Sequence, residues 1–263
     1  MSKPLPISSA DAAQGRQYSR NCGPIDIHCH RLAEATDCQI LSLDTHELAG
    51  SDDAAMPEAI FLPDRPSEQD PGIALPSNHY FSLGIHPWFI ERQDWQSALR
   101  TLVATSLNPD MLAVGECGLD KCIATPMDLQ IEVFTRQIEL AEHLGKPLII
   151  HCVKAFNELM RLKKTRKAQS VWIVHGFKAK PVLAAQLIKH GCYLSFGAAL
   201  LNLGSHAGQA LAETPPDRLF LETDSADVSI SEIYAATAKM LRIDAATLRQ
   251  QILSNFKRVF LND

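Results

Sequence analysis

The sequence predicts an α/β fold of a single domain, the (β/α)8 or TIM barrel, on three observations. Eight short apolar runs recur along the 263 residues, and continuous apolar runs are typical of parallel strands buried on both faces. Most stretches between these runs have the apolar spacing of amphipathic helices. The length also fits, because one such barrel takes about 250 residues. We therefore expect strands and helices to alternate around one closed sheet.

The eight predicted strands coincide with the apolar runs. They cover residues 24–30 (PIDIHCH), 38–43 (CQILSL), 80–86 (YFSLGIH), 111–116 (MLAVGE), 147–151 (PLIIH), 171–175 (VWIVH), 192–197 (CYLSFG) and 218–224 (RLFLETD). Parallel strands need long crossovers, which are usually helices. Helices are predicted at 94–106, 126–144, 155–166, 180–190, 208–213, 230–241 and 245–260.

The clearest predicted helix covers residues 126–144. Thr125 fits its N-cap, Pro126 fits its first position, and Asp128 complements the positive end of the helix dipole. Gly145 is expected to end it. Its apolar residues are spaced four, three, four and three apart along one face: Met127, Ile131, Phe134, Ile138 and Ala141.

The first two crossovers break the pattern. Between Arg31 and Asn78 there is no convincing amphipathic helix, and residues 50–78 are rich in Pro, Asp, Glu and Ser. We therefore expect loops in place of the first crossover helices. Residues 1–23 are predicted to form an N-terminal extension that precedes a barrel domain over 24–263.

The composition excludes several classes of protein. No run approaches the roughly 18 apolar residues that span a bilayer, and the first residues lack the apolar segment of a secretory signal. The seven cysteines contain no C-x-x-C pair, which is typical of free thiols in a reducing compartment. We expect a cytoplasmic protein with no membrane partner. The net charge of −5 disfavours binding of a long nucleic acid by charge alone.

Side chains that can bind a metal ion lie at the ends of five predicted strands. The C-terminal ends of barrel strands meet at one face, where active sites are found. Any one of these residues could serve the core or the surface, but six of them at five strand ends indicate a metal site. They are His28, His30, Glu116, His151, His175 and Asp224.

The pair His28 and His30 has the spacing of two residues on one strand face. Their side chains are expected about 6.6 to 7 Å apart along the strand, with Cys29 on the opposite face. Asp26 shares the histidine face and could orient an imidazole or serve as a buried carboxylate. Six ligands exceed the four that one tetrahedral Zn²⁺ needs, so they suit two cations that share a bridging ligand.

The motifs that carry these residues resemble those of the TatD-type deoxyribonucleases, metal-dependent hydrolases of the amidohydrolase-like barrel group. The matching pieces, in order, are IDIHCH, SLGIHPW, VGECGLDK, KPLIIHCVKAF, WIVHGF, LSFG, FLETD and NFKRVF. The likeness extends over about residues 24–261.

The resemblance implies two divalent cations per chain. One would be held by His28, His30 and Asp224, and the other by His151 and His175, with Glu116 bridging both. Asp224 is also similar to the family's proton acceptor, so Asp224 and Glu116 are the expected catalytic residues. Mixed imidazole and carboxylate ligands accept Mg²⁺, Mn²⁺ or Zn²⁺, so the metal stays open.

Departures from the family pattern concern the substrate pocket. Many members continue G-I-H-P with His, where this chain has Trp88, and the usual H-C-F-S-G is HGFK at 175–178. Members of the family commonly have a helix after the H-x-H pair, and no such helix is predicted in this chain. None of these changes touches a ligand. His86 is a candidate substrate contact or a structural residue, and Lys154 and Lys178 are candidates for phosphate binding.

Other residues near the motifs have simpler interpretations. Cys117 and Cys152 follow ligands directly, and strand alternation predicts that both are buried thiols. Asp120 is expected to stabilise the loop after Glu116, or to support a ligand. The basic stretch 161–167 is expected to be the solvated end of a helix. Five other histidines are expected at the surface or at helix caps: His46, His79, His143, His190 and His206.

Three functions stay open at this point. The resemblance implies a monomeric dinuclear hydrolase that cleaves DNA phosphodiesters, from a 3′ end or on short or single strands, with a water activated between the cations as nucleophile. A hydrolase of a small amide, lactone or phosphoester would use the same cations. A non-enzymatic protein with a structural metal site is disfavoured by the complete set of ligands and base.

Overall fold

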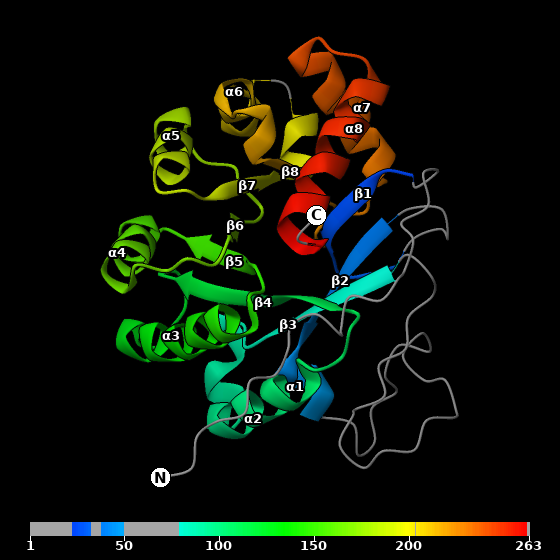
Figure 1. Ribbon diagram of the computed structural model, residues 1–263. Coiled ribbons are helices and arrows are strands. Elements are labelled where there is room, and N and C mark those ends of the chain that lie inside the picture. The colour runs from blue at the N-terminus through cyan, green and yellow to red at the C-terminus, as the bar shows by residue number, and fades with distance from the viewer. Residues whose placement is uncertain (1–22, 33–37, 50–78, 203, 262–263) are drawn as a thin grey trace, which may run out of the picture.

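The computed structural model describes residues 23–32, 38–49, 79–202 and 204–261, which form the predicted barrel (Figure 1). Eight parallel strands follow one another around the sheet in chain order. They are β1 (Ile25–Cys29), β2 (Cys38–Asp44), β3 (His79–Gly84), β4 (Met111–Asp120), β5 (Leu148–Val153), β6 (Trp172–Val174), β7 (Tyr193–Phe196) and β8 (Leu219–Leu221).

The seam between β1 and the segment after β8 nearly closes the barrel. Cys29 and Asp224 form an isolated parallel bridge. The Asp224 N–H donates to the His28 carbonyl at 2.9 Å, and the His30 N–H donates to the Asp224 carbonyl at 3.3 Å. The predicted fold class is therefore confirmed, and the seam places the first and last predicted ligands side by side.

Helices cover the outside of the strands (Figure 1). The α-helices are α1 (Thr45–Ala49), α2 (Trp95–Thr105), α3 (Met127–Leu144), α4 (Phe156–Arg166), α5 (Pro181–Lys189), α6 (His206–Glu213), α7 (Ile230–Leu241) and α8 (Ala245–Phe256). Short 3-10 helices are η2 (Pro87–Arg92), η3 (Ala198–Leu201) and η4 (Pro216–Arg218), and a π-helical turn, η5 (Lys257–Leu261), follows α8. None of the described helices is long and apolar enough to cross a membrane.

The start of α3 differs from the prediction by one residue. Pro126, with φ −55° and ψ 137°, takes the N-cap position predicted for Thr125, and the helix begins at Met127. The reason is that Pro126 has extended rather than helical backbone angles. Gly145 ends the helix with φ 64°, as predicted, because glycine adopts left-handed angles without steric cost. The predicted apolar face packs inward, with Phe134, Ile138 and Ala141 buried and Met127 and Ile131 partly buried.

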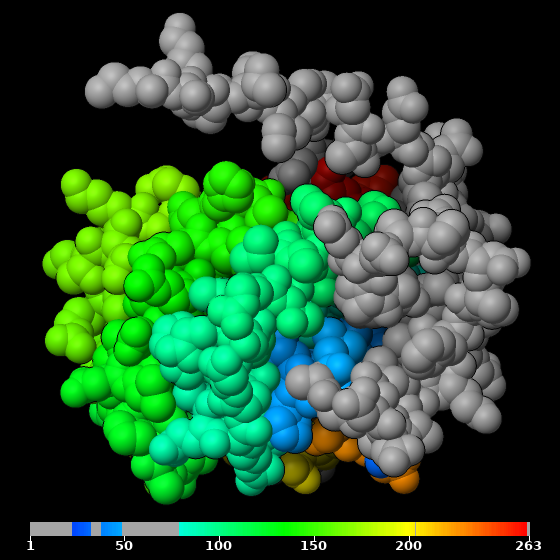
Figure 2. Space-filling model, turned by 90° about the horizontal axis from the view of Figure 1, so that it is seen from below, coloured from blue at the N-terminus to red at the C-terminus, as the bar shows by residue number. Residues whose placement is uncertain are grey.

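The second crossover contains a helix that the sequence did not predict. Helix α1 has only five residues, too few to show an apolar period. In the space-filling view, blue residues of the region of β2 and α1 lie against cyan-green residues that follow β3 in the chain (Figure 2), and Thr45 Oγ1 donates to Gln93 Oε1 at 2.9 Å. The predicted loop over 50–78, residues 33–37 of the first crossover and all but one residue of the extension over 1–23 lie outside the described residues.

Strand β4 is longer than predicted, which changes the position of Glu116. Pairing with β5 continues to the pair Asp120 and Val153, so Glu116 lies inside β4 and not at its end. Gly118 makes this possible, because a Cβ at that position would lie 2.0 Å from the His151 carbonyl oxygen. The added length brings Asp120 beside β5.

Candidate metal centre

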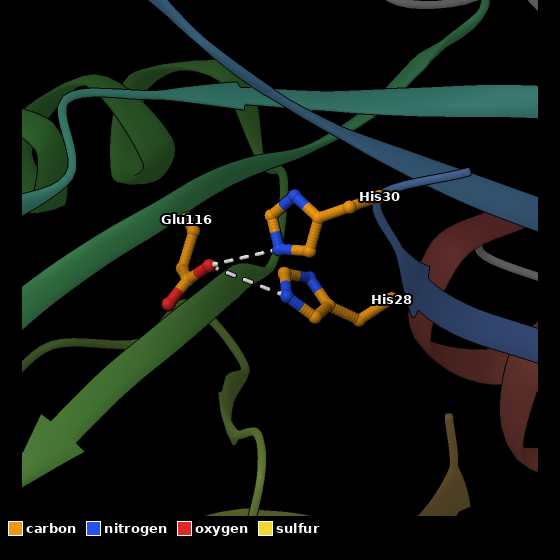
Figure 3. Close-up of side chains that lie close together, drawn as sticks. All are labelled: His28, His30 and Glu116. Carbon is orange, nitrogen blue, oxygen red and sulfur yellow. Dashed lines mark ion pairs between the residues drawn. The ribbon is translucent and has the colours of Figure 1, made fainter. Parts of the chain in front are cut away.

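Glu116 lies at the centre of the predicted ligands, and its two carboxylate oxygens face different partners. On the Oε2 side, the His28 Nε2 atom lies 3.3 Å away and the His30 Nε2 atom 3.8 Å away (Figure 3). The Asp224 Oδ1 atom lies 3.5 Å from His30 Nε2 and 3.9 Å from His28 Nε2. We call His28, His30 and Asp224 the Oε2 side.

The Oε1 side consists of His86, His151 and His175. The distances from Glu116 Oε1 are 2.8 Å to His175 Nε2, 2.9 Å to His151 Nδ1 and 3.0 Å to His86 Nε2. All six predicted ligands therefore meet around one carboxylate, and His86 joins them.

The donor atoms fit divalent cations. Three groups of ligand atoms each lie within 4.8 Å of one another: His28, His30 and Glu116; His28, His175 and Asp224; and His86, Glu116 and His151. His28 is fully buried, and its Nδ1 atom has no hydrogen-bond partner among the described residues, while its Nε2 atom lies 3.3 Å from Glu116 Oε2 without the geometry of a hydrogen bond. A buried imidazole without a partner is costly, and a cation would remove that cost.

The electrostatics of the site favour an ionised Glu116. Burial alone would raise the pKa of Glu116, but the charge of His175 and hydrogen bonds from His151 and His175 hold it well below its ordinary value. Burial would lower the pKa of His175, but the Glu116 charge raises it well above the ordinary value. A proton on His175 and a cation at the same nitrogen are therefore alternatives.

Asp120 supports His151 from the side away from Glu116. Its Oδ2 atom lies 3.1 Å from His151 Nε2 and accepts a hydrogen bond from Trp88 Nε1 at 2.8 Å. Its Oδ1 atom accepts from the Cys122 N–H at 2.7 Å. Asp120 therefore contacts both the following loop and a predicted ligand, so both interpretations of Asp120 are compatible with its position.

Glu222 is a site residue that the sequence reasoning missed. It is fully buried, and its Oε1 atom accepts from the Gly176 N–H at 2.5 Å and lies 3.6 Å from His175 Nδ1. Contacts of this kind fix the orientation of a ligating imidazole. The signal was available in the LETD run, where Glu222 stands two residues before Asp224.

Asp26 proves to be a structural carboxylate. Its Oδ1 atom accepts from the backbone N–H groups of His28 and Thr223, and its Oδ2 atom accepts from Thr223 Oγ1 at 2.6 Å. Burial raises the pKa of Asp26 to about 7. No imidazole contact to Asp26 is found in the described part of the chain, so this residue ties β1 to the segment after β8.

His86 is held as a hydrogen-bond donor toward the centre. Its Nδ1 atom accepts from the Trp88 N–H at 3.1 Å, so a neutral ring carries its proton on Nε2 and donates to Glu116. Burial lowers the pKa of His86, which favours this neutral form. Asp44 Oδ2 accepts from the His86 N–H at 2.7 Å and fixes the backbone there.

A cavity of about 670 Å³ opens at this face of the barrel. Its lining includes His30, His86, Glu116, His151, His175, Asp224, Trp88, Lys154 and Lys178. The two lysines are exposed, which leaves their ammonium groups free to meet an anion. The cavity thus brings five of the six predicted ligands, all but His28, and the predicted phosphate-binding residues to one space.

Two predictions about neighbouring residues are wrong. Cys152 is half-buried, because the last three residues of β5 are half-buried and line the cavity, whereas Cys117 is buried as predicted. His79 is buried in β3 instead of lying at the surface, because β3 begins one residue earlier than predicted. The other histidines are exposed or half-buried, and His46 stacks on Phe89 with ring centroids 5.2 Å apart.

Comparison with known proteins identifies the family. The family model described as TatD related DNase matches residues 25–261. The chain is 24% identical to the Escherichia coli metal-dependent hydrolase YjjV over 91% of this chain and 98% of that protein. The crystal structure of the E. coli TatD homologue YJJV covers 90% of this chain, with 98% of its own length matched, a TM-score of 0.71 and 21% identity.

Other relatives match over part of their length. The metal-dependent hydrolase YabD of Bacillus subtilis is 33% identical over 55% of this chain and 58% of its own length. The E. coli protein named 3'-5' ssDNA/RNA exonuclease TatD is 27% identical over 57% of this chain and 58% of its own length. The matched part is thus little more than half of either protein. With the match of the family model across the barrel, this chain belongs to the TatD family of metal-dependent hydrolases.

Proposed function

We propose that this protein is a dinuclear metal-dependent phosphodiesterase that removes nucleotides from the 3′ ends of short or single-stranded DNA. The observation that carries the proposal is Glu116, whose two oxygens face separate groups of imidazoles and carboxylates. The name of the E. coli relative, a 3'-5' ssDNA/RNA exonuclease, supports the substrate class. Residues 24–263 would form the catalytic unit.

The proposed cation sites follow the two sides of Glu116. His28, His30 and Asp224 would hold one divalent cation, and His151 and His175 the other, with Glu116 shared. When bound, such a pair supplies a water of lowered pKa and positive charge for the phosphate. The support shown by Asp120 and Glu222 suits this assignment, because each contacts the ring nitrogen that faces away from Glu116.

Asp224 is the proposed proton acceptor. Burial would raise its pKa, but the hydrogen bond with His30 keeps the pKa of Asp224 below its ordinary value, so the carboxylate is ionised. Its side chain is 39% exposed and lines the cavity, so a proton taken from the attacking water can pass to solvent. Its backbone φ of 54° is unusual for a residue other than glycine, and such angles often mark functional positions.

Three further residues are proposed to bind the substrate phosphate. His86 would donate its Nε2 proton to a phosphate oxygen, since its tautomer is fixed by the Trp88 amide. Lys154 and Lys178 would add charge from the cavity wall. A hydrogen-bond donor and two ammonium groups near the centre offset the net charge of −5 locally.

The test uses single-stranded DNA with a labelled 3′ end and protein loaded with Mg²⁺, Mn²⁺ or Zn²⁺. We expect the wild-type protein to release the label and the Glu116→Ala, Asp224→Asn double variant to release none. Asp217→Asn is a matched control, because Asp217 is exposed in η4 at the opposite end of β8 and should not change the rate.

Each outcome has a defined meaning. Equal degradation by wild type and double variant would assign the activity to a contaminant. Absence of DNA cleavage, together with metal-dependent hydrolysis of small lactones, amides or phosphoesters, would favour the small-molecule hydrolase. Elemental analysis should give two metals per wild-type chain and fewer in the double variant.

A further inference from the structure

Trp88 is a large aromatic side chain that is exposed to solvent at the edge of the cavity. It lines the cavity and is 50% exposed, although the rest of the 3-10 helix η2 buries Pro87 and Ile90. An exposed indole loses the favourable burial that an aromatic side chain usually obtains. A role in the folded core alone therefore does not explain its position.

The indole of Trp88 is nevertheless held in one orientation. Its Nε1–H donates to Asp120 Oδ2 at 2.8 Å. Its ring centroid lies 5.0 Å from that of His86 and 5.6 Å from that of His151, with interplanar angles of 87° and 76°. Because both imidazoles contact Glu116, Trp88 is a fixed aromatic surface directly beside the metal centre.

Among the described residues, the basic stretch 161–167 runs away from the cavity. The basic stretch 161–167 lies at the C-terminal end of α4, whereas Phe156 at its start lines the cavity. At 1.5 Å per residue, this basic stretch begins about 8 Å along the helix from Phe156 and ends about 16 Å from it. Arg166 is also paired with Glu139 at 2.8 Å. Affinity for a nucleotide must then come from the cavity itself.

We propose that Trp88 stacks on the nucleobase of the nucleotide being removed, and so selects unpaired ends; the proposal rests on the proposed function. Every base offers a flat face, so stacking on an aromatic side chain accepts any sequence. A base inside a duplex already stacks on its neighbours and pairs with its partner, and it would have to leave both to reach Trp88. The substrate class is thus a single-stranded or frayed 3′ end.

The first test is a double-mutant cycle between Trp88 and the base. The substrates are one single-stranded oligonucleotide with a normal 3′-terminal nucleotide and the same oligonucleotide with an abasic one. In wild type, loss of the base should lower kcat/KM about 5- to 150-fold. In Trp88→Leu the two substrates should differ by less than about twofold, while Trp88→Phe should keep much of the difference because phenyl rings also stack.

A matched control separates stacking from damage to the fold. Trp95 at the start of α2 is half-buried and does not line the cavity, so Trp95→Phe should keep the wild-type base dependence. If Trp88 only positions Asp120 and His151, Trp88→Leu will slow both substrates by the same factor and the base dependence will persist. That result overturns the proposal.

A second test does not depend on DNA cleavage. Thymidine 5′-monophosphate and 2-deoxyribose 5-phosphate are compared as inhibitors of bis(p-nitrophenyl) phosphate hydrolysis and as quenchers of tryptophan fluorescence. Stacking predicts that the nucleotide binds about 5- to 150-fold more tightly in wild type, and that Trp88→Leu removes this preference. Equal binding of both ligands to wild type overturns the stacking even if DNA is cleaved. Absence of DNA cleavage with a Trp88-dependent preference overturns the proposed function alone.

Discussion

The two sides of Glu116 differ in their contact with solvent and in how they are supported. On the Oε2 side, the side chains of His30 and Asp224 are 40% and 39% exposed, whereas those of His151 and His175 on the Oε1 side are 11% and 7% exposed. The Oε1 side is held by buried or nearly buried carboxylates, and the Oε2 side by the barrel seam. His28 on the Oε2 side is fully buried, so the contrast rests on His30 and Asp224. If the two proposed cations bind, we expect the one on the Oε1 side to be held more firmly, and the one on the Oε2 side to exchange more readily with solvent.

The largest effect is expected from the residue that both sides share. Glu116→Gln removes the negative charge that faces the imidazoles of the centre, so the affinity for both proposed cations should fall. We expect kcat to fall by about three orders of magnitude or more, and the metal content to fall below one per chain. Steady-state kinetics and elemental analysis check this. Retention of two metals would contradict the bridging role.

Asp224→Asn should reduce cation binding on the Oε2 side alone. We expect a loss of about 10²- to 10⁴-fold in kcat, since a proton acceptor is removed, with one cation retained on the Oε1 side. Metal content measured after dialysis is the deciding quantity. Loss of both cations would show that the two sides are not separate sites.

Asp120→Asn and Glu222→Gln should each lower the metal affinity of the Oε1 side. Both substitutions replace a carboxylate that contacts the outer nitrogen of a ligand ring, and such contacts contribute about 10- to 100-fold to metal affinity. Titration with a competing chelator should show weaker binding of one cation and an unchanged affinity for the other. Weakening of both cations alike would argue against two independently supported sides.

The smallest effect concerns the stability of the metal-free protein. The pKa of Asp26 is raised to about 7 in the folded state, above the ordinary value of 3.8, so the folded chain binds the extra proton. This stabilisation is complete below about pH 4 and is lost as the pH rises through about 7, with a slope of up to about 1.4 kcal/mol per pH unit.

Asp26→Asn should remove that slope. The difference in the free energy of unfolding between wild type and Asp26→Asn is therefore expected to shift in favour of the variant between about pH 4 and pH 7. Urea unfolding of both proteins at several pH values, after removal of metal, measures it. A difference that does not change with pH would contradict the assignment.

Residues with a local signal were predicted well. The strands appear as apolar runs, and the six ligands lie close to strand ends where the barrel brings them together. Glu222 was missed because its role depends on its distance from His175, a residue that follows β6 and is far away in the sequence. The extension of β4 past Glu116 was also missed, because it depends on Gly118 passing close to the His151 carbonyl.

Orientation and exposure were the properties that the sequence could not supply. The tautomer of His86 follows from an amide two residues later, which only the turn into η2 makes available. The sequence showed that Trp88 replaces the His common in the family, but not that its indole is exposed and donates a hydrogen bond to Asp120. Strand alternation placed Cys117 correctly and failed for Cys152, where the strand opens onto the cavity.

The seam between Cys29 and Asp224 has a consequence for synthesis of the protein in the cell. The predicted ligands of the Oε2 side lie at the end of β1 and in the segment after β8, and the backbone bonds of the seam hold these two segments together. A chain still emerging from the ribosome holds His28 and His30 but not Asp224. If Asp224 is the proton acceptor, we expect the nascent chain to be inactive until Asp224 has been synthesised and the barrel has closed.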